Sequence, residues 1–139
     1  MTMPKMHIHP IATHFSNGLI PTSLFFLGLY FVFREDCLET MAFYLLAAGT
    51  AGSCVALLTG MVDHKMKFKG AWVPIFKKKI GAALGAVLGG GAACGVRYFH
   101  PGLIEELTWL TCVYFALLLF VLGCVTAAGH WGGKLVFNK

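Results

Sequence analysis

Charged residues are scarce in this chain, and the few that occur leave long stretches without any. Asp, Glu, Lys and Arg make up 12% of the 139 residues, while 58% are hydrophobic; a soluble domain carries about 25% charged residues. No charged residue occurs in residues 6–33, 40–62, 80–96 and 107–133. A helix needs about 20 apolar residues to cross a bilayer. These stretches leave no room for a second soluble domain and exclude a nuclease or a disulfide-linked secreted domain.

Motifs for covalent cofactors and for catalysis are also missing. The five cysteines form no CxxC or CxxCH motif, which argues against a c-type haem, an iron–sulfur cluster or a zinc finger. No Walker loop, no Ser/His/Asp order and no acidic pair within a hydrophobic stretch occurs, so a proton-coupled transporter is disfavoured. Residues 1–10 lack the features of a signal peptide, and we expect the first hydrophobic segment to remain in the mature protein.

The sequence predicts an all-α fold: an integral membrane four-helix bundle that forms a single domain over residues 1–139. The spans are helices because lipid offers no hydrogen-bond partners to an open backbone. We predict the spans at roughly 11–33, 40–62, 80–99 and 107–129. The basic segment 63–79 mixes lysines with aromatic residues, and we expect it to lie at the membrane interface.

Basic residues are distributed unequally between the two sides of the predicted bundle. Four spans place both termini and segment 63–79 on one side, which receives nine of the eleven Lys and Arg residues. The connections on the other side are net acidic. The net charge of +5 therefore reflects membrane topology and not a nucleic-acid surface. By the positive-inside rule, both termini are predicted to be cytoplasmic.

Histidines that are distant in the sequence converge at one depth of this bundle. His14 lies in the first turn of the first span, and His64 and His130 follow the ends of the second and fourth spans. His9 precedes the first span on the same side. Odd spans begin and even spans end on that side, so these imidazoles share one membrane level. Histidine near a bilayer core is costly and tends to mark a functional site.

Small side chains leave room beside these imidazoles. Gly18 lies one helical turn deeper than His14, and Gly60 lies one turn deeper than His64. A b-type haem needs two facing imidazoles, small residues where the macrocycle packs, and cations near its propionates. We therefore predict a b-type cytochrome-like electron-transfer subunit of the membrane. Its haem b would be held by two of the three residues His14, His64 and His130. The candidate cofactor-binding residues are His14, His64, His130, His9, Gly18 and Gly60.

Two other functions stay open. The histidines suit a zinc, copper or iron ion, which would make the chain a membrane metal-binding protein. The candidate metal ligands are His14, His64, His130 and His9. Alternatively, the chain is a non-catalytic structural subunit of a larger complex. An electron-transfer or structural subunit is favoured over an enzyme acting by itself, and no catalytic residue is assigned.

The third span and the position of the haem site both indicate partners. Gly81, Gly85 and Gly89 repeat at four-residue spacing, which lets helices approach closely. This stripe can dock a second copy, giving a homo-oligomer, or a larger redox complex. A single haem near one surface cannot carry an electron across the bilayer, so we expect a protein partner, a quinone or a second cofactor.

Three short motifs resemble a known family. Residues 9–15 read HPIATHF and match HPxxxHF, residues 59–63 read TGMVD and match TGxxD, and residues 132–137 read GGKLVF, close to GGxLVY. In this order they resemble a bacterial family of four-helix membrane proteins catalogued as domain of unknown function 2231. The resemblance implies four spans in the bacterial inner membrane. His9 and His14 belong to these motifs, whereas His64 and His130 do not.

Overall fold

Four long helices account for most of the part of the chain that the computed structural model describes, which is residues 8–68, 74–106 and 108–137. They are α1 (Ile8–Phe33), α2 (Asp36–Phe68), α3 (Pro74–Phe99) and α4 (Trp109–Phe137). Each is long and apolar enough to cross a membrane. The predicted all-α, four-helix fold is confirmed.

The second and third helices extend further than the predicted spans. α2 continues to Phe68, and α3 already begins at Pro74, so the segment predicted as an interfacial connection is helical at both ends. Charged residues end a hydrophobic stretch, but they do not end a helix. Proline is well suited to the first position of α3, where an N–H would have no helical partner. Residues 69–73 of the predicted interfacial segment lie outside the described residues.

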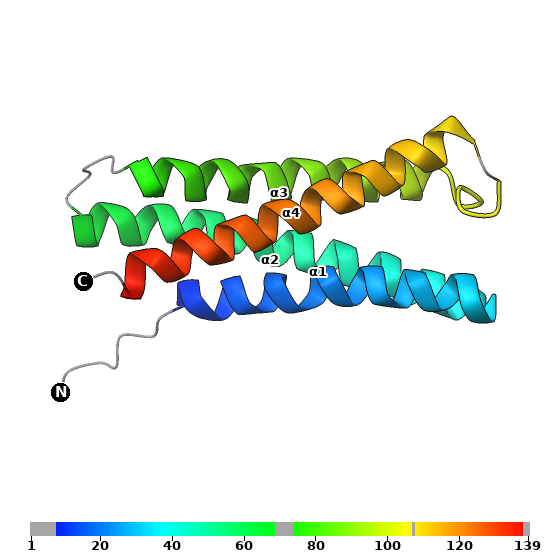
Figure 1. Cartoon of the computed structure of the whole chain (residues 1–139), viewed down its shortest axis with the longest axis horizontal. Helices are drawn as coiled ribbons and strands as arrows, with labels where there is room; N and C mark the ends of the chain where they lie inside the picture. Colours follow the sequence, from blue (N-terminus) through cyan, green and yellow to red (C-terminus); the bar gives the residue numbers. More distant parts are fainter. Residues whose placement is uncertain (1–7, 69–73, 107, 138–139) are drawn as a thin grey trace.

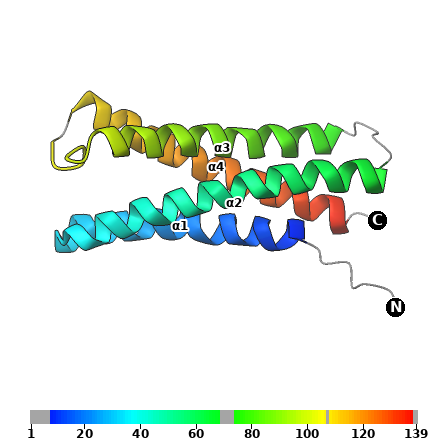
Figure 2. The same ribbon diagram turned by 180° about the vertical axis from the view of Figure 1, so that it is seen from behind.

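The helices alternate in direction around a ring (Figures 1 and 2). α1 contacts α2 and α4, and α3 contacts the same two helices; helices on the diagonals make no such contacts within the described ranges. The start of α1 and the end of α4 lie at the same end of the bundle. We call this the lysine end, because it carries Lys65, Lys77, Lys78, Lys79 and Lys134. The opposite end, with the α1–α2 connection and residues 100–106, is the acidic end.

A left-handed residue makes the reversal between α1 and α2. Arg34 has a φ of 55°, and its N–H donates to the carbonyl of Tyr30 at 2.8 Å, which closes the last turn of α1. The first turn of α2 carries Asp36 and Glu39. These carboxylates lie where the positive end of the helix dipole favours negative charge.

Glycines allow close helix packing within the chain itself. A Cβ added at Gly85 or Gly89 would lie within 3.4 Å of the ring of Phe120 on α4. A Cβ at Gly90 would lie 2.3 Å from Oγ1 of Thr50 on α2. Much of the glycine-rich face predicted to dock a partner therefore packs against neighbouring helices of the same chain.

The packing of the bundle differs between its two halves. A large apolar cluster fills the acidic half, and its fully buried members include Leu46, Tyr114 and Leu118. A smaller cluster of Ile20, Ala86, Val121 and Val125 lies at mid-length. Between this second cluster and the lysine end, polar side chains face the interior, and this is where a pocket is found.

Candidate functional site: a pocket at the lysine end

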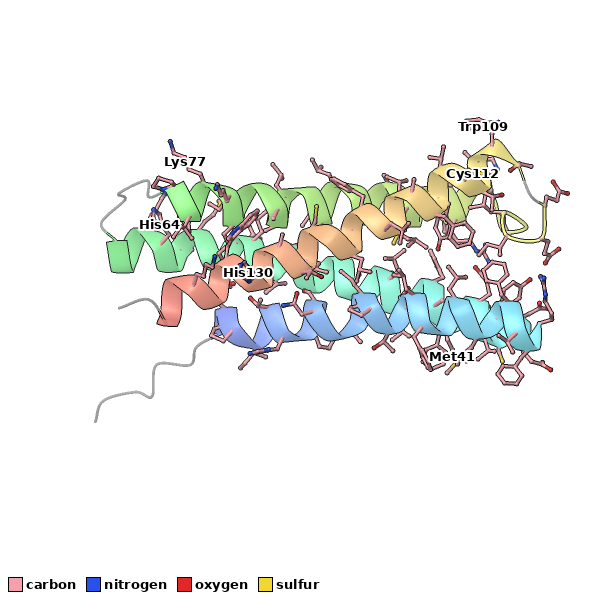
Figure 3. All side chains as sticks on the ribbon, in the orientation of Figure 1. Met41, His64, Lys77, Trp109, Cys112 and His130 are labelled. Carbon is pink, nitrogen blue, oxygen red and sulfur yellow. The ribbon has the colours of Figure 1, made fainter. Side chains whose placement is uncertain are left out.

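The predicted histidine ligands differ in exposure, and His64 and His130 both lie at the lysine end (Figure 3). His14 and His130 are exposed on the surfaces of α1 and α4. His64 is 5% exposed, and its ring stacks on Phe76 with 3.4 Å between centroids. Among the described residues, no group of three or more His, Cys, Asp or Glu side chains is placed to hold a metal ion.

Residues of all four helices line a pocket at this end, and His9 is the one predicted histidine ligand among them. Its volume is about 40 Å³, which is room for about three water molecules. This enclosed space is much smaller than a haem. The polar lining residues are His9, Thr13, Ser16, Asn17, Ser53 and Lys79.

His9 belongs to a hydrogen-bond chain that joins three helices. Lys79 Nζ lies 2.9 Å from His9 Nε2. A lysine ammonium can only donate, so Nε2 accepts and the ring proton sits on Nδ1. Nδ1 lies 3.3 Å from Oγ1 of Thr59, and the Thr59 hydroxyl donates to the carbonyl of Val55 at 2.7 Å. The chain fixes the orientation of a neutral imidazole at the wall of the pocket.

The hydroxyl groups of the pocket present acceptors and not donors. Thr13, Ser16 and Ser53 donate their protons to carbonyls one turn earlier in their own helices, at 2.9, 3.1 and 3.0 Å. Their oxygen lone pairs remain to face the pocket. Lys79 and the amide of Asn17 bring N–H donors to the same wall. The pocket is therefore matched to a polar group that both donates and accepts hydrogen bonds.

The two glycines predicted to flank a cofactor differ in their surroundings. Gly60 lines the pocket, and a Cβ there would lie 2.9 Å from Cε1 of His9. Glycine at this position makes room for the imidazole ring itself. Gly18 is exposed, and a Cβ there would meet nothing within 4 Å.

Sequence reasoning missed Lys79, Asn17 and the hydroxyl groups. Lys79 is the last of three consecutive lysines, and charge alone does not distinguish them. Helical spacing does, because Phe76 and Ala83 lie three and four residues away on the same face and also line the pocket. In the same way, Asn17 shares a face with His9 and Thr13 on α1.

The pocket is closed at its inner end. The mid-length cluster lies directly below it, with Ile20, Ala86 and Val121 fully buried. The large apolar cluster follows toward the acidic end. Within the described residues, this packing leaves a blind pocket, which suits binding and does not suit conduction across the membrane.

The fold and the four apolar helices define a multi-pass membrane protein with a pocket between its helices, in which a few polar groups stand among apolar walls. The chain belongs to the family of predicted membrane proteins designated domain of unknown function 2231, whose family model matches residues 5–139. No curated protein and no solved structure matches the chain.

Proposed function

We propose that this protein is a membrane-embedded binding subunit for a lipid-soluble quinone. Its pocket receives the polar carbonyl end of the quinone. The observation that carries the proposal is the convergence of Lys79, His9 and Asn17 on an otherwise apolar pocket between membrane-spanning helices. Ligand pockets typically combine apolar walls with a few polar groups that fix orientation.

The chemistry of the wall supports this ligand class. A quinone carbonyl accepts hydrogen bonds from the N–H donors of Lys79 or Asn17. A reduced quinone hydroxyl donates to the lone pairs of Ser16 or Ser53. The enclosed volume of about 40 Å³ admits the carbonyl end, while the remaining ring and tail extend toward lipid. The apolar walls are formed by alanines together with Leu57, Ile80 and Val125.

The distribution of charge supports an orientation with the lysine end, and so both termini, in the cytoplasm. Lys65, Lys77, Lys78 and Lys134 are exposed at that end, and cytoplasmic flanks of membrane proteins are rich in lysine and arginine. A bacterial inner membrane would then present the pocket to quinones in its cytoplasmic leaflet.

We expect Lys79→Gln to weaken quinone binding by roughly ten- to a hundredfold, because a hydrogen bond from a charged donor contributes about 1.5–3 kcal/mol. Binding of decylubiquinone to the protein in detergent is measured by quenching of tryptophan fluorescence and by the change in melting temperature. His9→Ala removes the partner of Lys79 and should weaken binding by a smaller factor.

Matched controls come from the same helices. Lys78→Gln and His14→Ala change exposed residues that do not line the pocket, and we expect wild-type affinity for both. Absence of saturable decylubiquinone binding to the wild type, or equal losses in Lys78→Gln and Lys79→Gln, would contradict the proposal.

A b-type cytochrome is the second candidate, and the exposure of His14 and His130 on the neighbouring helices α1 and α4 favours it. A haem would bind between these residues on the outer surface of the bundle, because the interior pocket is too small. Two such faces brought together in a homo-oligomer would shield the macrocycle. Gly81, Gly91 and Gly95 on α3 offer a further open face for a partner, since a Cβ at each meets nothing within 4 Å.

The absorbance spectrum of the purified protein tests this candidate. We expect a Soret band that sharpens on reduction and is lost in His14→Ala and in His130→Ala. His64→Ala, at a buried ring stacked on Phe76, should retain the band. A colourless protein with stoichiometric zinc, copper or iron would favour the metal-binding alternative. A protein with neither haem nor metal would contradict both and leave quinone binding as the function to test.

A further inference from the structure

A second cleft lies at the acidic end, separated from the pocket at the lysine end by the apolar core. Its volume is about 220 Å³. It opens between the start of α2, the end of α3 and the segment that follows α3. Its lining includes the side chains of Tyr30, Asp36, Glu39, Arg97, Ile104 and Glu105.

An ion pair forms the base of this cleft. Arg97 Nε donates to Oε1 of Glu39, and Nη2 donates to Oε2 of the same carboxylate. Glu39 is 7% exposed. The positive charge of Arg97 compensates the negative charge of this buried carboxylate. Two-point contact with a carboxylate uses two of the five N–H groups of a guanidinium. Arg97 lines the cleft and has three N–H groups that these two contacts with Glu39 do not use.

The rim of the cleft carries negative charge. Asp36 and Glu105 line the cleft and are exposed. Since Glu39 and Arg97 neutralise each other, these two carboxylates give the cleft a net negative charge. Tyr30 and Ile104, both buried, add an apolar wall. The lining thus combines carboxylates that can receive an ammonium group with a guanidinium that can donate hydrogen bonds to a carboxylate.

We propose that this cleft binds a small zwitterion, an α-amino acid with a short uncharged side chain. The ammonium group lies between Asp36 and Glu105, and the carboxylate receives hydrogen bonds from Arg97. The side chain packs on Ile104. A volume of about 220 Å³ accommodates such a molecule and its first water molecules.

Other ligand classes fit this arrangement less well. A bare anion would meet two carboxylates at the rim, and a bare organic cation would meet the guanidinium at the base. A divalent cation would need several oxygen ligands around one point, and the described residues contain no group of three acidic, histidine or cysteine side chains so placed. The zwitterion satisfies both charges at once.

The test measures the melting temperature of the full-length protein in detergent as L-alanine is added. We expect a saturable rise with a half-maximal effect at roughly millimolar concentration, because so small a ligand makes few contacts. At tenfold excess over that concentration, the rise should reach roughly 5 °C. Methylammonium chloride and sodium acetate, which each supply half of the ligand, should require at least tenfold higher concentrations.

Neighbouring carboxylates provide matched variants. Glu105→Gln should raise the half-maximal concentration at least fivefold, whereas Glu106→Gln, which is exposed but does not line the cleft, should leave it unchanged. Asp36→Asn and Glu35→Gln form a second such pair. The absence of a saturable effect of L-alanine, an equal effect of methylammonium, or equal losses in Glu105→Gln and Glu106→Gln would overturn the proposal. Lys79→Gln should not alter the response, which separates this site from the quinone pocket.

Discussion

Arg97→Met is expected to destabilise the protein by about 3–5 kcal/mol, because it leaves the buried carboxylate of Glu39 without its partner. The pair joins α2 to α3 at the acidic end, with relative side-chain exposures of 16% for Arg97 and 9% for Glu39. Removing one member of a buried ion pair costs far more than the pair itself contributes. The free energy of unfolding is measured by SDS titration in mixed micelles, with helicity followed by circular dichroism.

Two further variants separate the ion pair from general effects of losing an arginine. The double variant Glu39→Gln with Arg97→Met removes both charges and should recover most of the lost stability. Arg34→Met changes an exposed arginine at the same end, which lies 5.9 Å from the ring centroid of Tyr30 and 5.6 Å from that of Phe31. We expect it to cost no more than about 1 kcal/mol. Equal losses in Arg34→Met and Arg97→Met would contradict the argument.

Gly90→Ala has the second large expected effect, a loss of about 2–3 kcal/mol. The new methyl group would lie 2.3 Å from Oγ1 and 2.9 Å from Cγ2 of Thr50, so α2 and α3 must move apart. Rotation of the threonine is opposed by its hydrogen bond to the carbonyl of Leu46 at 2.8 Å. The same SDS titration measures the loss, and a lower melting temperature should accompany it.

Gly91→Ala is the matched control for this prediction. Gly91 is exposed on the same helix, and a Cβ there meets nothing within 4 Å. We expect unchanged or slightly higher stability, within about 1 kcal/mol. Combining Thr50→Ala with Gly90→Ala removes both contacting atoms and should restore much of the stability. A Gly90→Ala variant as stable as Gly91→Ala would show that the two helices are not in close contact there.

The sequence was sufficient to predict the helices and their order, because charge-free stretches report the thickness of the hydrocarbon layer directly. It located their ends less well. Asp63 ended the predicted second span but lies within α2, since hydrophobicity reports what lipid tolerates and not where backbone hydrogen bonds stop. The connection between α1 and α2 was easier to predict, because Arg34 and Glu35 follow immediately after an apolar run.

The candidate site was less predictable, because membrane depth and helix face are separate properties. Depth follows from position along a span, and it brought His14, His64 and His130 to one end. The face depends on how each helix is rotated, which a four-helix sequence with exposed apolar surfaces does not reveal. In the structure, lipid-facing and interior faces are both apolar, so the amphipathic pattern that orients a soluble helix is absent. The rotation of each helix about its own axis is seen only from contacts between helices, such as that between Gly60 and the ring of His9.

Two of the polar links between helices, taken together, have a mechanical consequence. The hairpin of α1 and α2 is fastened to α3 at both ends, by His9 to Lys79 at one and by Glu39 to Arg97 at the other. A ligand that draws Lys79 away from His9 would break the link at the lysine end and leave the link between Glu39 and Arg97 intact. We therefore expect binding in the pocket to let the two hairpins separate more at the lysine end than at the acidic end.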